Sequence, residues 1–286
     1  MRRHLQHHGA RGFSLVELMI TLLLGAIITG AVIQVLVSSQ VTNKLNQAIA
    51  QVQESGRFIM TRLSRELLEV GRYDNVAAQI DGSVDTVSEA AYVVNHPVVL
   101  IGDMATSLTL GSTQAGSGGN DSLVVSMLAS EDCTGNRHGY AAGDEFHVVN
   151  RYFVSDSELK CTGYDGRVLR GLKVAGVAPS TVTLLDNVES FQVQYGVTSD
   201  IDTSNGQAVR YVTADELGVL RANNQQVVAL RWGVLIKSYE SQLQTTSPRF
   251  AVLNEAPVTL DNLHYYQVFT KTLALRNMKN FVRSSQ

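Results

Sequence analysis

The chain has 286 residues, a formal net charge of −3 and a hydrophobic fraction of 44%, which suits one membrane segment with one medium-sized domain, or two domains at most. The charge balance argues against a duplex nucleic-acid binder, because such a protein needs a strongly basic surface. Hydrophobic residues are concentrated at 13–37, and the region after them is rich in Ser, Thr, Gln, Asn and Val. The composition therefore predicts an exported, strand-rich domain on a membrane segment.

The first predicted element is a membrane-spanning helix at residues 13–37. An apolar run of about 25 residues, rising about 1.5 Å per residue, is long enough for a hydrocarbon core of about 30 Å. Arg2, Arg3 and Arg11 precede the run, so the leader is predicted to stay in the cytoplasm while the rest of the chain crosses the membrane. A cleaved secretory signal has a shorter apolar core followed by a small-residue cleavage site, and this sequence fits neither feature.

One acidic residue, Glu17, lies inside this apolar run. A carboxylate near the middle of a bilayer costs roughly 2.5–3.5 kcal/mol on insertion scales, so it needs a partner and marks a functional position. The structural alternative is a glutamate near the helix end whose carboxylate reaches the lipid headgroups.

Residues 12–17, with the sequence GFSLVE, resemble the type IV prepilin motif, which has a glycine, an aromatic residue and then a glutamate. The resemblance implies that a prepilin peptidase cuts between Gly12 and Phe13 and methylates the new amine of Phe13. The mature chain would then have 286 − 12 = 274 residues. The resemblance also implies that Glu17 pairs with the amine of a neighbouring subunit and sets the axial register in a low-dielectric setting.

The helical period continues past the membrane segment. Apolar residues recur at steps of three or four at Val41, Leu45, Ile49, Val52, Gly56, Ile59, Leu63 and Leu67. No proline occurs between residues 13 and 71, so one helix of about 57 residues, roughly 85 Å long, is predicted to end near Gly71. Its second half is predicted to pack on the exported domain, and a coiled-coil stalk is the alternative.

After Gly71 the period changes to two, which indicates strands. The predicted strands are 93–101, 122–128, 145–154, 167–172, 181–185, 188–197, 227–236 and 269–275. Long loops are predicted at 111–121 and 198–226, and the second loop is predicted to contain a short helix at 213–220. The strands are expected to form largely antiparallel sheet.

Several further segments are similar to PilW-type minor pilins. They are residues 57–73 at the end of the long helix, 188–197, 211–214, 227–237 and 269–277. The resemblance implies an α+β, pilin-like fold in which the long N-terminal helix packs on a largely antiparallel β domain. It also implies a leader at 1–12, a transmembrane half-helix at 13–37, an amphipathic half-helix at 38–70 and a periplasmic domain at 71–286.

Two cysteines, Cys133 and Cys161, follow the membrane segment, and an even count in an exported domain predicts one disulfide. Two unrelated buried thiols are the structural alternative. A zinc site of these cysteines with His138 and His147 has no recognised ligand spacing. Residues 200–206 are similar to a calcium loop, but their glycine comes one position late, which favours a solvated turn. We therefore expect no metal and no cofactor.

The sequence lacks the common nucleophile, zinc-protease, phosphate-loop and dinucleotide motifs, so no enzymatic activity is predicted. The resemblance to PilW-type proteins implies a minor pilin that helps to prime a type IV pilus, and hence supports twitching motility, adhesion or DNA uptake. The partners that it implies are the prepilin peptidase, other minor pilins, the major pilin, the inner-membrane assembly platform and the lipid bilayer. The alternatives are a J-type minor pseudopilin of type II secretion and a membrane-anchored periplasmic binding or enzymatic domain.

Overall fold

The computed structural model of the chain describes residues 12–74, 76–116, 118–200, 206–241, 246–253 and 255–278. Two compact units make up the chain: an N-terminal unit at Met1–Gln47 and a C-terminal unit at Ala48–Gln286. Helix α1, Leu15–Leu67, runs through the end of the first unit into the second. The leader predicted at residues 1–12 lies outside the described residues except for Gly12.

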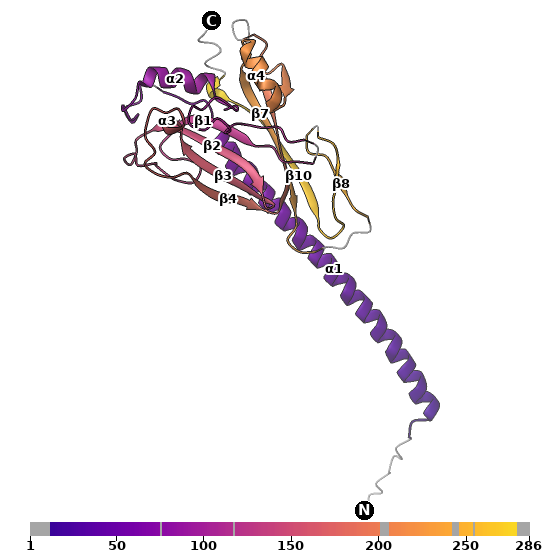
Figure 1. Ribbon diagram of the computed structural model, residues 1–286. Coiled ribbons are helices and arrows are strands. Elements are labelled where there is room, and N and C mark those ends of the chain that lie inside the picture. The colour runs from indigo at the N-terminus through magenta and orange to yellow at the C-terminus, as the bar shows by residue number, and fades with distance from the viewer. Residues whose placement is uncertain are drawn as a thin grey trace, which may run out of the picture. The chain divides into compact units, whose positions relative to one another are not determined.

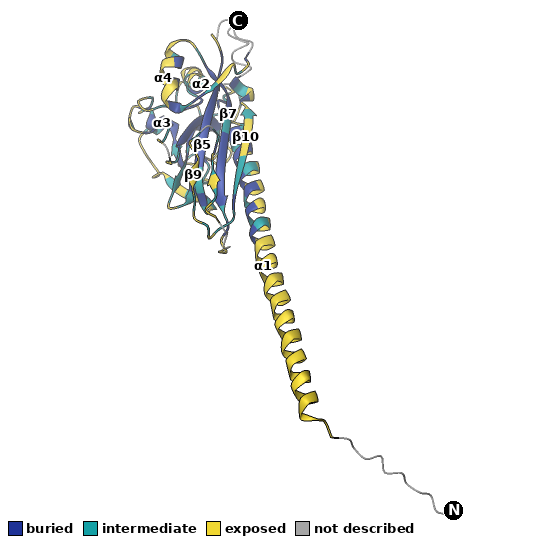
Figure 2. Cartoon of the chain, turned by 90° about the vertical axis from the view of Figure 1, so that its right-hand side faces the viewer, coloured by how far each residue is buried: buried dark blue, intermediate teal, exposed yellow. Residues whose placement is uncertain are grey.

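Helix α1 presents different surfaces in the two units. Every described residue of the N-terminal unit is exposed (Figure 2). In the C-terminal unit, α1 buries one stripe at helical spacing, formed by Ala48, Val52, Gly56, Ile59, Leu63, Ser64 and Leu67. The predicted apolar stripe is thus buried only from residue 48 onward, since Val41 and Leu45 remain 59% and 39% exposed.

Antiparallel strands fill most of the C-terminal unit (Figure 1). Within the described residues, one sheet has the order β1-β2-β3-β4, a second has the order β10-β7-β5-β6, and β8 pairs with β9. The strands are β1 Leu123–Ala129, β2 Phe146–Ser155, β3 Glu158–Asp165, β4 Ser180–Asp186, β5 Val188–Val197, β6 Arg210–Val212, β7 Val227–Lys237, β8 Arg249–Phe250, β9 Val258–Thr259 and β10 Tyr266–Ala274. The predicted fold class, α+β with a long N-terminal helix and largely antiparallel sheet, is confirmed.

Six of the eight predicted strands are confirmed, and they correspond to β1, β2, β4, β5, β7 and β10. The helix predicted at 213–220 is also confirmed, as α4 at Ala214–Ala222 with Thr213 at its N-cap. Strand β3 and the short strands β6, β8 and β9 were not predicted.

The strand predicted at 93–101 is wrong over its first part, where helix α2 occupies Thr86–Asn95. Asp85 caps this helix, because its carboxylate accepts a hydrogen bond from the backbone N–H of Val87 at 3.0 Å. After α2 ends, Val98 forms a single bridge to Val125 of β1. The cap, rather than the β-propensity of the valines, decides the local structure.

The strand predicted at 167–172 is wrong, because helix α3 occupies Gly166–Leu169. Asp165 caps α3 by accepting from the N–H of Arg167 at 2.9 Å. The Arg167 guanidinium is fully buried and donates to the fully buried Glu89 carboxylate at 2.8 and 2.9 Å. It also pairs with Asp81. This tertiary ion cluster requires a turn at Arg167 rather than an extended strand.

The main core lies between the second half of α1 and both four-stranded sheets. It contains Ile59 and Leu63 of α1, Leu123 and Phe146 of one sheet, and Phe191 and Trp232 of the other. Each such side chain contributes about 1.5–3 kcal/mol when fully buried. The core therefore fixes α1 against the sheets from residue 48 onward.

Two contacts fix this part of α1 more closely. A Cβ atom at Gly56 would collide with the ring of Phe269, so glycine lets this ring pack directly against the backbone of α1. The buried phenol of Tyr152 donates to the Glu66 carboxylate at 2.6 Å. Burial and the charge of Glu66 raise the pKa of Tyr152, which keeps this donor protonated. Gly71, with a φ of +73°, follows the helix end as predicted.

Replacing Arg167 by Leu is expected to lower the free energy of unfolding by roughly 3–5 kcal/mol, because Glu89 would remain buried without its partner. Chemical denaturation of the full chain in detergent measures this loss. Arg137→Leu is the matched control, since Arg137 and its partner Glu131 are 48% and 41% exposed. It should cost less than about 1 kcal/mol. Similar losses in the two variants would contradict a stabilising role for the buried cluster.

Candidate processing and assembly site

The predicted processing site lies at the start of α1, in the N-terminal unit. The hydroxyl of Ser14 accepts a hydrogen bond from the backbone N–H of Glu17 at 3.2 Å, and its carbonyl accepts from the N–H of Leu18 at 3.1 Å. Ser14 is therefore the N-cap of α1, and Glu17 occupies its third position, as in a capping box. This arrangement leaves Gly12 and Phe13 outside the helix.

Gly12 and Phe13 have no packing role in the described part of the chain. Phe13 is 79% exposed, and a Cβ atom built on Gly12 would meet nothing within 4 Å. Glycine at this position is therefore not required by the fold.

Glu17 lies in the first turn of α1 and is exposed. Its location at the N-terminus of the helix is electrostatically favourable, because the helix dipole is positive there. Its neighbours are apolar and exposed, with Leu15 at 76% and Leu18 at 54%. Within the described residues, no side chain or backbone group donates to its carboxylate.

Three threonine hydroxyls along α1 form their hydrogen bonds within the helix itself. The hydroxyls of Thr21, Thr29 and Thr42 donate to backbone carbonyls three or four residues earlier, at 2.8–3.0 Å. Such bonds remove free hydroxyl donors from an apolar surface. By length and composition α1 can cross a membrane, because its best 18-residue window has a mean hydropathy of 2.4 and none of it is buried. Glu17 is thus the one charge in this stretch that the helix leaves unneutralised, as far as the structure describes it.

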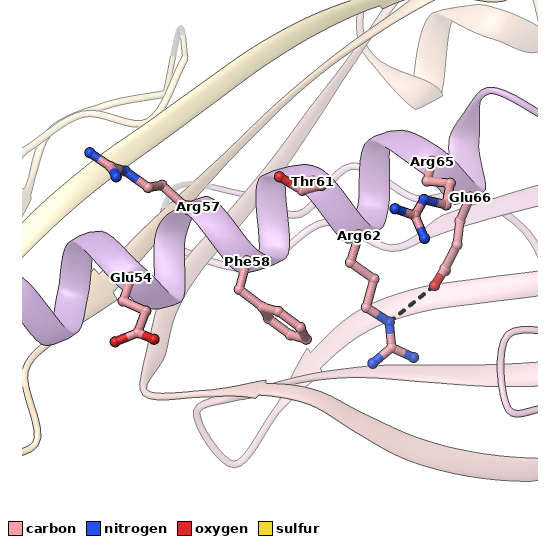
Figure 3. A pocket seen from close by; sticks show the side chains of 7 residues that line it. All are labelled: Glu54, Arg57, Phe58, Thr61, Arg62, Arg65 and Glu66. Carbon is pink, nitrogen blue, oxygen red and sulfur yellow. Dashed lines mark hydrogen bonds and ion pairs between the residues drawn. The ribbon is translucent and has the colours of Figure 1, made fainter.

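A second candidate contact surface lies on α1 in the C-terminal unit, and we call it the outer face. Figure 3 shows its side chains: Glu54, Arg57, Phe58, Thr61, Arg62, Arg65 and Glu66. These positions follow helical spacing and border a groove of about 720 Å³. Phe58 is 52% exposed, and Arg62 pairs with Glu66 at 3.1 Å. Arg57 and Arg65 have no acidic partner in the part of the chain that the structure describes.

Cys133 and Cys161 form a disulfide, with their Cα atoms 6.4 Å apart. The bond joins β3 to the loop that follows β1. Both thiols are therefore used, and the zinc site considered above is not assembled. His138 and His147 are also engaged, with Asp132 at 2.8 Å and with Ser126 at 2.7 Å.

The Ser126–His147 pair is the kind of pair that could suggest a nucleophile with its base. Both residues are fully buried, and burial lowers the pKa of His147 to about 3. The pair is therefore sealed from substrate and acts as a packing contact. The calcium loop considered at 200–206 lies mostly outside the described residues. The described residues contain no group of three or more His, Cys, Asp or Glu placed to hold a metal.

Two family models match the chain. Residues 146–277 match the Type IV Pilus-assembly protein W family, and residues 7–33 match the prokaryotic N-terminal methylation motif. The second match contains Gly12, Phe13 and Glu17. The predicted resemblance to type IV pilin-like proteins, and among them to PilW-type proteins, is therefore confirmed. These families are structural rather than enzymatic, and the methylation motif implies processing by a prepilin peptidase and contact with other pilins.

Solved structures match as well. A type IV-like pilin from Thermus thermophilus is similar to 79% of this chain over 97% of its own length, with 14% sequence identity and a TM-score of 0.40. No curated protein matches the chain.

Sequence reasoning missed two features of the site. Ser14 was not identified as the cap, although Ser followed by Glu three residues later is a known signal. The arginines of the outer face are evident in the sequence. Their exposure is not, because it depends on which side of α1 packs against the sheets. Nothing in the structure tests the cleavage position, the methylation or the role of Glu17, and they remain predictions.

Breaking the disulfide is expected to lower the free energy of unfolding by roughly 3–4 kcal/mol, because the bond closes a loop of 28 residues. Unfolding of the full chain in denaturant should therefore shift to lower concentration on reduction. A Cys133→Ala/Cys161→Ala variant should match the reduced protein and should not respond to the reductant. Equal midpoints for the oxidised and reduced chain would contradict this prediction.

Proposed function

We propose that the chain is a minor pilin that joins other minor pilins to prime assembly of a type IV pilus. The observation that carries this proposal is Glu17, an exposed carboxylate without a donor among the described residues, at the start of an otherwise apolar helix. A carboxylate in this position requires a positive partner in lipid or in a filament. The match to the assembly-protein-W family supports a role in the pilus itself.

Maturation supplies that partner in the proposal. Cutting between Gly12 and Phe13 creates a positive amine at Phe13, which the peptidase then methylates. The side chain of Phe13 is exposed, and Ser14 rather than Phe13 caps the helix, so the amine is accessible to another subunit. Glu17 of an incoming subunit then pairs with the amine of its neighbour, and this pair sets their axial register.

The same proposal assigns the parts of the chain to compartments. The leader at 1–12 is removed, residues 13–37 cross the bacterial inner membrane, and 38–70 continue as the amphipathic half-helix. Residues 71–286 form a periplasmic domain, with the N-terminus in the cytoplasm. The disulfide supports this assignment, because disulfides persist in oxidising compartments such as the periplasm.

The outer face of α1 provides a second contact in this proposal. Its occupant is a helix of a neighbouring pilin-like subunit, because its side chains recur at the spacing that helix packing uses. Phe58 inserts as the apolar anchor, and acidic residues of the partner meet Arg57 and Arg65. Motility, adhesion or DNA uptake then belong to the assembled pilus rather than to this chain alone.

Mass spectrometry of the membrane-extracted protein tests the processing step. We expect a mature chain of 274 residues, from 286 − 12, that begins with N-methylated Phe13. Gly12→Val should accumulate the uncut precursor, whereas Gly25→Val, at a glycine with equally free space, should be cut normally. A membrane form that still begins at Met1 would refute the proposal.

Glu17→Gln keeps the size of the side chain and removes its charge. We expect normal cutting but about tenfold lower incorporation into pili, since a charge-assisted hydrogen bond is worth about 1.5 kcal/mol or more. Glu69→Gln is the control, because Glu69 is an exposed glutamate beyond the apolar part of the chain. Wild-type piliation in the Glu17→Gln strain would exclude the pairing role.

Phe58→Ser should weaken binding to the other minor pilins roughly thirtyfold, as expected for an anchor worth about 2 kcal/mol. Val219→Ser is the matched control, because Val219 is a 66% exposed apolar residue on α4, away from the outer face. Both variants should fold normally, and co-purification from detergent extracts measures the binding. Equal binding by the two variants would remove the outer face from the proposal.

Deleting the gene separates this proposal from the J-type pseudopilin of type II secretion. Loss of pili with intact protein secretion supports the minor pilin. Loss of secretion with intact pili would assign the chain to the secretion system instead.

A further inference from the structure

A small cavity in the C-terminal unit lies apart from the helix surfaces described above. It has a volume of about 230 Å³ and is bordered by β5, β6, the start of α4 and four loop residues, Gln114, Asp121, Leu253 and Glu255. Its polar lining includes Gln114, Asp121, Gln192, Gln194, Glu216 and Glu255. The cavity is smaller than the 300–1,000 Å³ of typical small-molecule sites, and it suits one side chain or a similarly small group.

The lining is rich in hydrogen-bond acceptors. Asp121, Glu216 and Glu255 contribute three carboxylates, and no Lys, Arg or His is among the described residues that line the cavity. Asp121 is only 2% exposed, and its carboxylate accepts from the N–H groups of Ala115 and Val193 at 2.9 and 2.8 Å. The cavity therefore concentrates negative charge in a partly desolvated place.

The glutamines of the lining add acceptors that are unused. The side-chain oxygens of Gln114, Gln192 and Gln194 are buried and have no hydrogen-bond partner within the described residues. Gln192 and Gln194 are 4% and 8% exposed. Because a buried acceptor without a partner is unfavourable, three of them around one cavity point to a ligand that donates hydrogen bonds.

The orientation of two of these amides is fixed by their nitrogen atoms. The Gln192 amide nitrogen donates to the carbonyl of Gly119 at 2.7 Å, and that of Gln114 donates to Glu255 at 2.8 Å and to the carbonyl of Ala115 at 3.3 Å. A flipped amide would place oxygen against these acceptors, so the free atom is oxygen in both cases.

The charge of the site favours a cation as the donor. Burial, together with the charges of Glu255 and Asp215, raises the pKa of Asp121 to about 6 against the effect of its two backbone donors. The start of α4 also borders the cavity and would favour an anion. However, the Glu216 carboxylate already accepts from the N–H of Thr213 at 3.4 Å, and three carboxylates outweigh a partial helix charge.

We infer that this cavity binds a cationic group with several N–H donors, a guanidinium or an alkylammonium. A guanidinium presents five donors in a fixed plane, which matches separate carboxylate and amide oxygens. A metal ion fits less well, because the described residues place no three carboxylates together as ligands. The group can be an arginine or lysine side chain of another protein or a small free cation. The inference goes beyond the proposed pilin function and does not depend on it.

Isothermal titration of the full mature chain in detergent with n-butylguanidinium tests the inference. We expect a dissociation constant on the order of 1 mM, which is typical of a ligand of this size. The neutral isostere n-butylurea should bind at least about tenfold more weakly, because it lacks the charge that the carboxylates stabilise. Equal binding of the two compounds would overturn the inference.

Glu255→Gln removes one lining charge and keeps an acceptor for Gln114. It should weaken n-butylguanidinium binding at least about fivefold, since hydrogen bonds to charged groups are the stronger ones. Glu131→Gln, at a glutamate of the other sheet's loop region, should leave binding unchanged. Thermal unfolding of both variants checks that they fold. Unchanged binding in Glu255→Gln would locate the ligand elsewhere and overturn the inference.

Two further arms identify the source of the cation and exclude other ligands. A blocked Ala-Arg-Ala peptide that binds more tightly than n-butylguanidinium indicates a side chain of a protein partner, and exclusion of the peptide indicates a small free cation. Calcium that displaces n-butylguanidinium at equimolar concentration, or acetate that binds in its place, would overturn the inference. So would the absence of binding at about 10 mM n-butylguanidinium, where a site of the expected affinity is mostly filled.

Discussion

The carboxylate of Glu17, which has no donor among the described residues, constrains the rest of the molecule. It lies at the exposed start of an apolar helix, and the described residues of the N-terminal unit are exposed throughout. Such a surface is unfavourable in water and must be covered by lipid or by neighbouring subunits. Lipid covers the apolar side chains but leaves the charge without a partner, whereas a neighbour with a positive amine satisfies both. The same helix end is therefore suited to two environments in succession.

In the C-terminal unit, the same helix packs against a folded domain instead of being exposed on all sides. Below residue 48 no side chain of α1 is buried, and from Ala48 onward one stripe enters the core while Arg57 and Arg65 lie outside it. The core ties α1 to both four-stranded sheets, with Gly56 allowing the close approach of β10. Tyr152 and Glu66 add a buried polar contact.

Sequence patterns predicted the elements that depend on local periodicity. Helix α1 and strand β5 follow from apolar spacing alone, and α4 follows from its cap at Thr213. Helices α2 and α3 were missed because capping aspartates and the buried Arg167–Glu89 pair, which joins residues 78 positions apart, override β-propensity. Strand β3 was missed because its Gly163 and Cys161 are placed by contacts with Asp132 and Cys133 rather than by propensity. The predicted processing residues were readable from a contiguous motif, whereas the acidic cavity unites residues from 114 to 255 and has no contiguous signal.

The distribution of charge along α1 also indicates what drives assembly. No charged residue occurs between Glu17 and Lys44. The stretch has 44 − 17 − 1 = 26 residues, and at about 1.5 Å per residue it is about 39 Å long. The stretch exceeds a hydrocarbon core of about 30 Å, so the helix can shift along the membrane normal without burying Lys44. A shift that takes Glu17 to the centre of the bilayer costs roughly 2.5–3.5 kcal/mol in lipid alone. Under the proposed function, an ion pair with a neighbouring subunit removes this cost at one axial position, and the carboxylate then favours that register while the apolar surface contributes little to the choice.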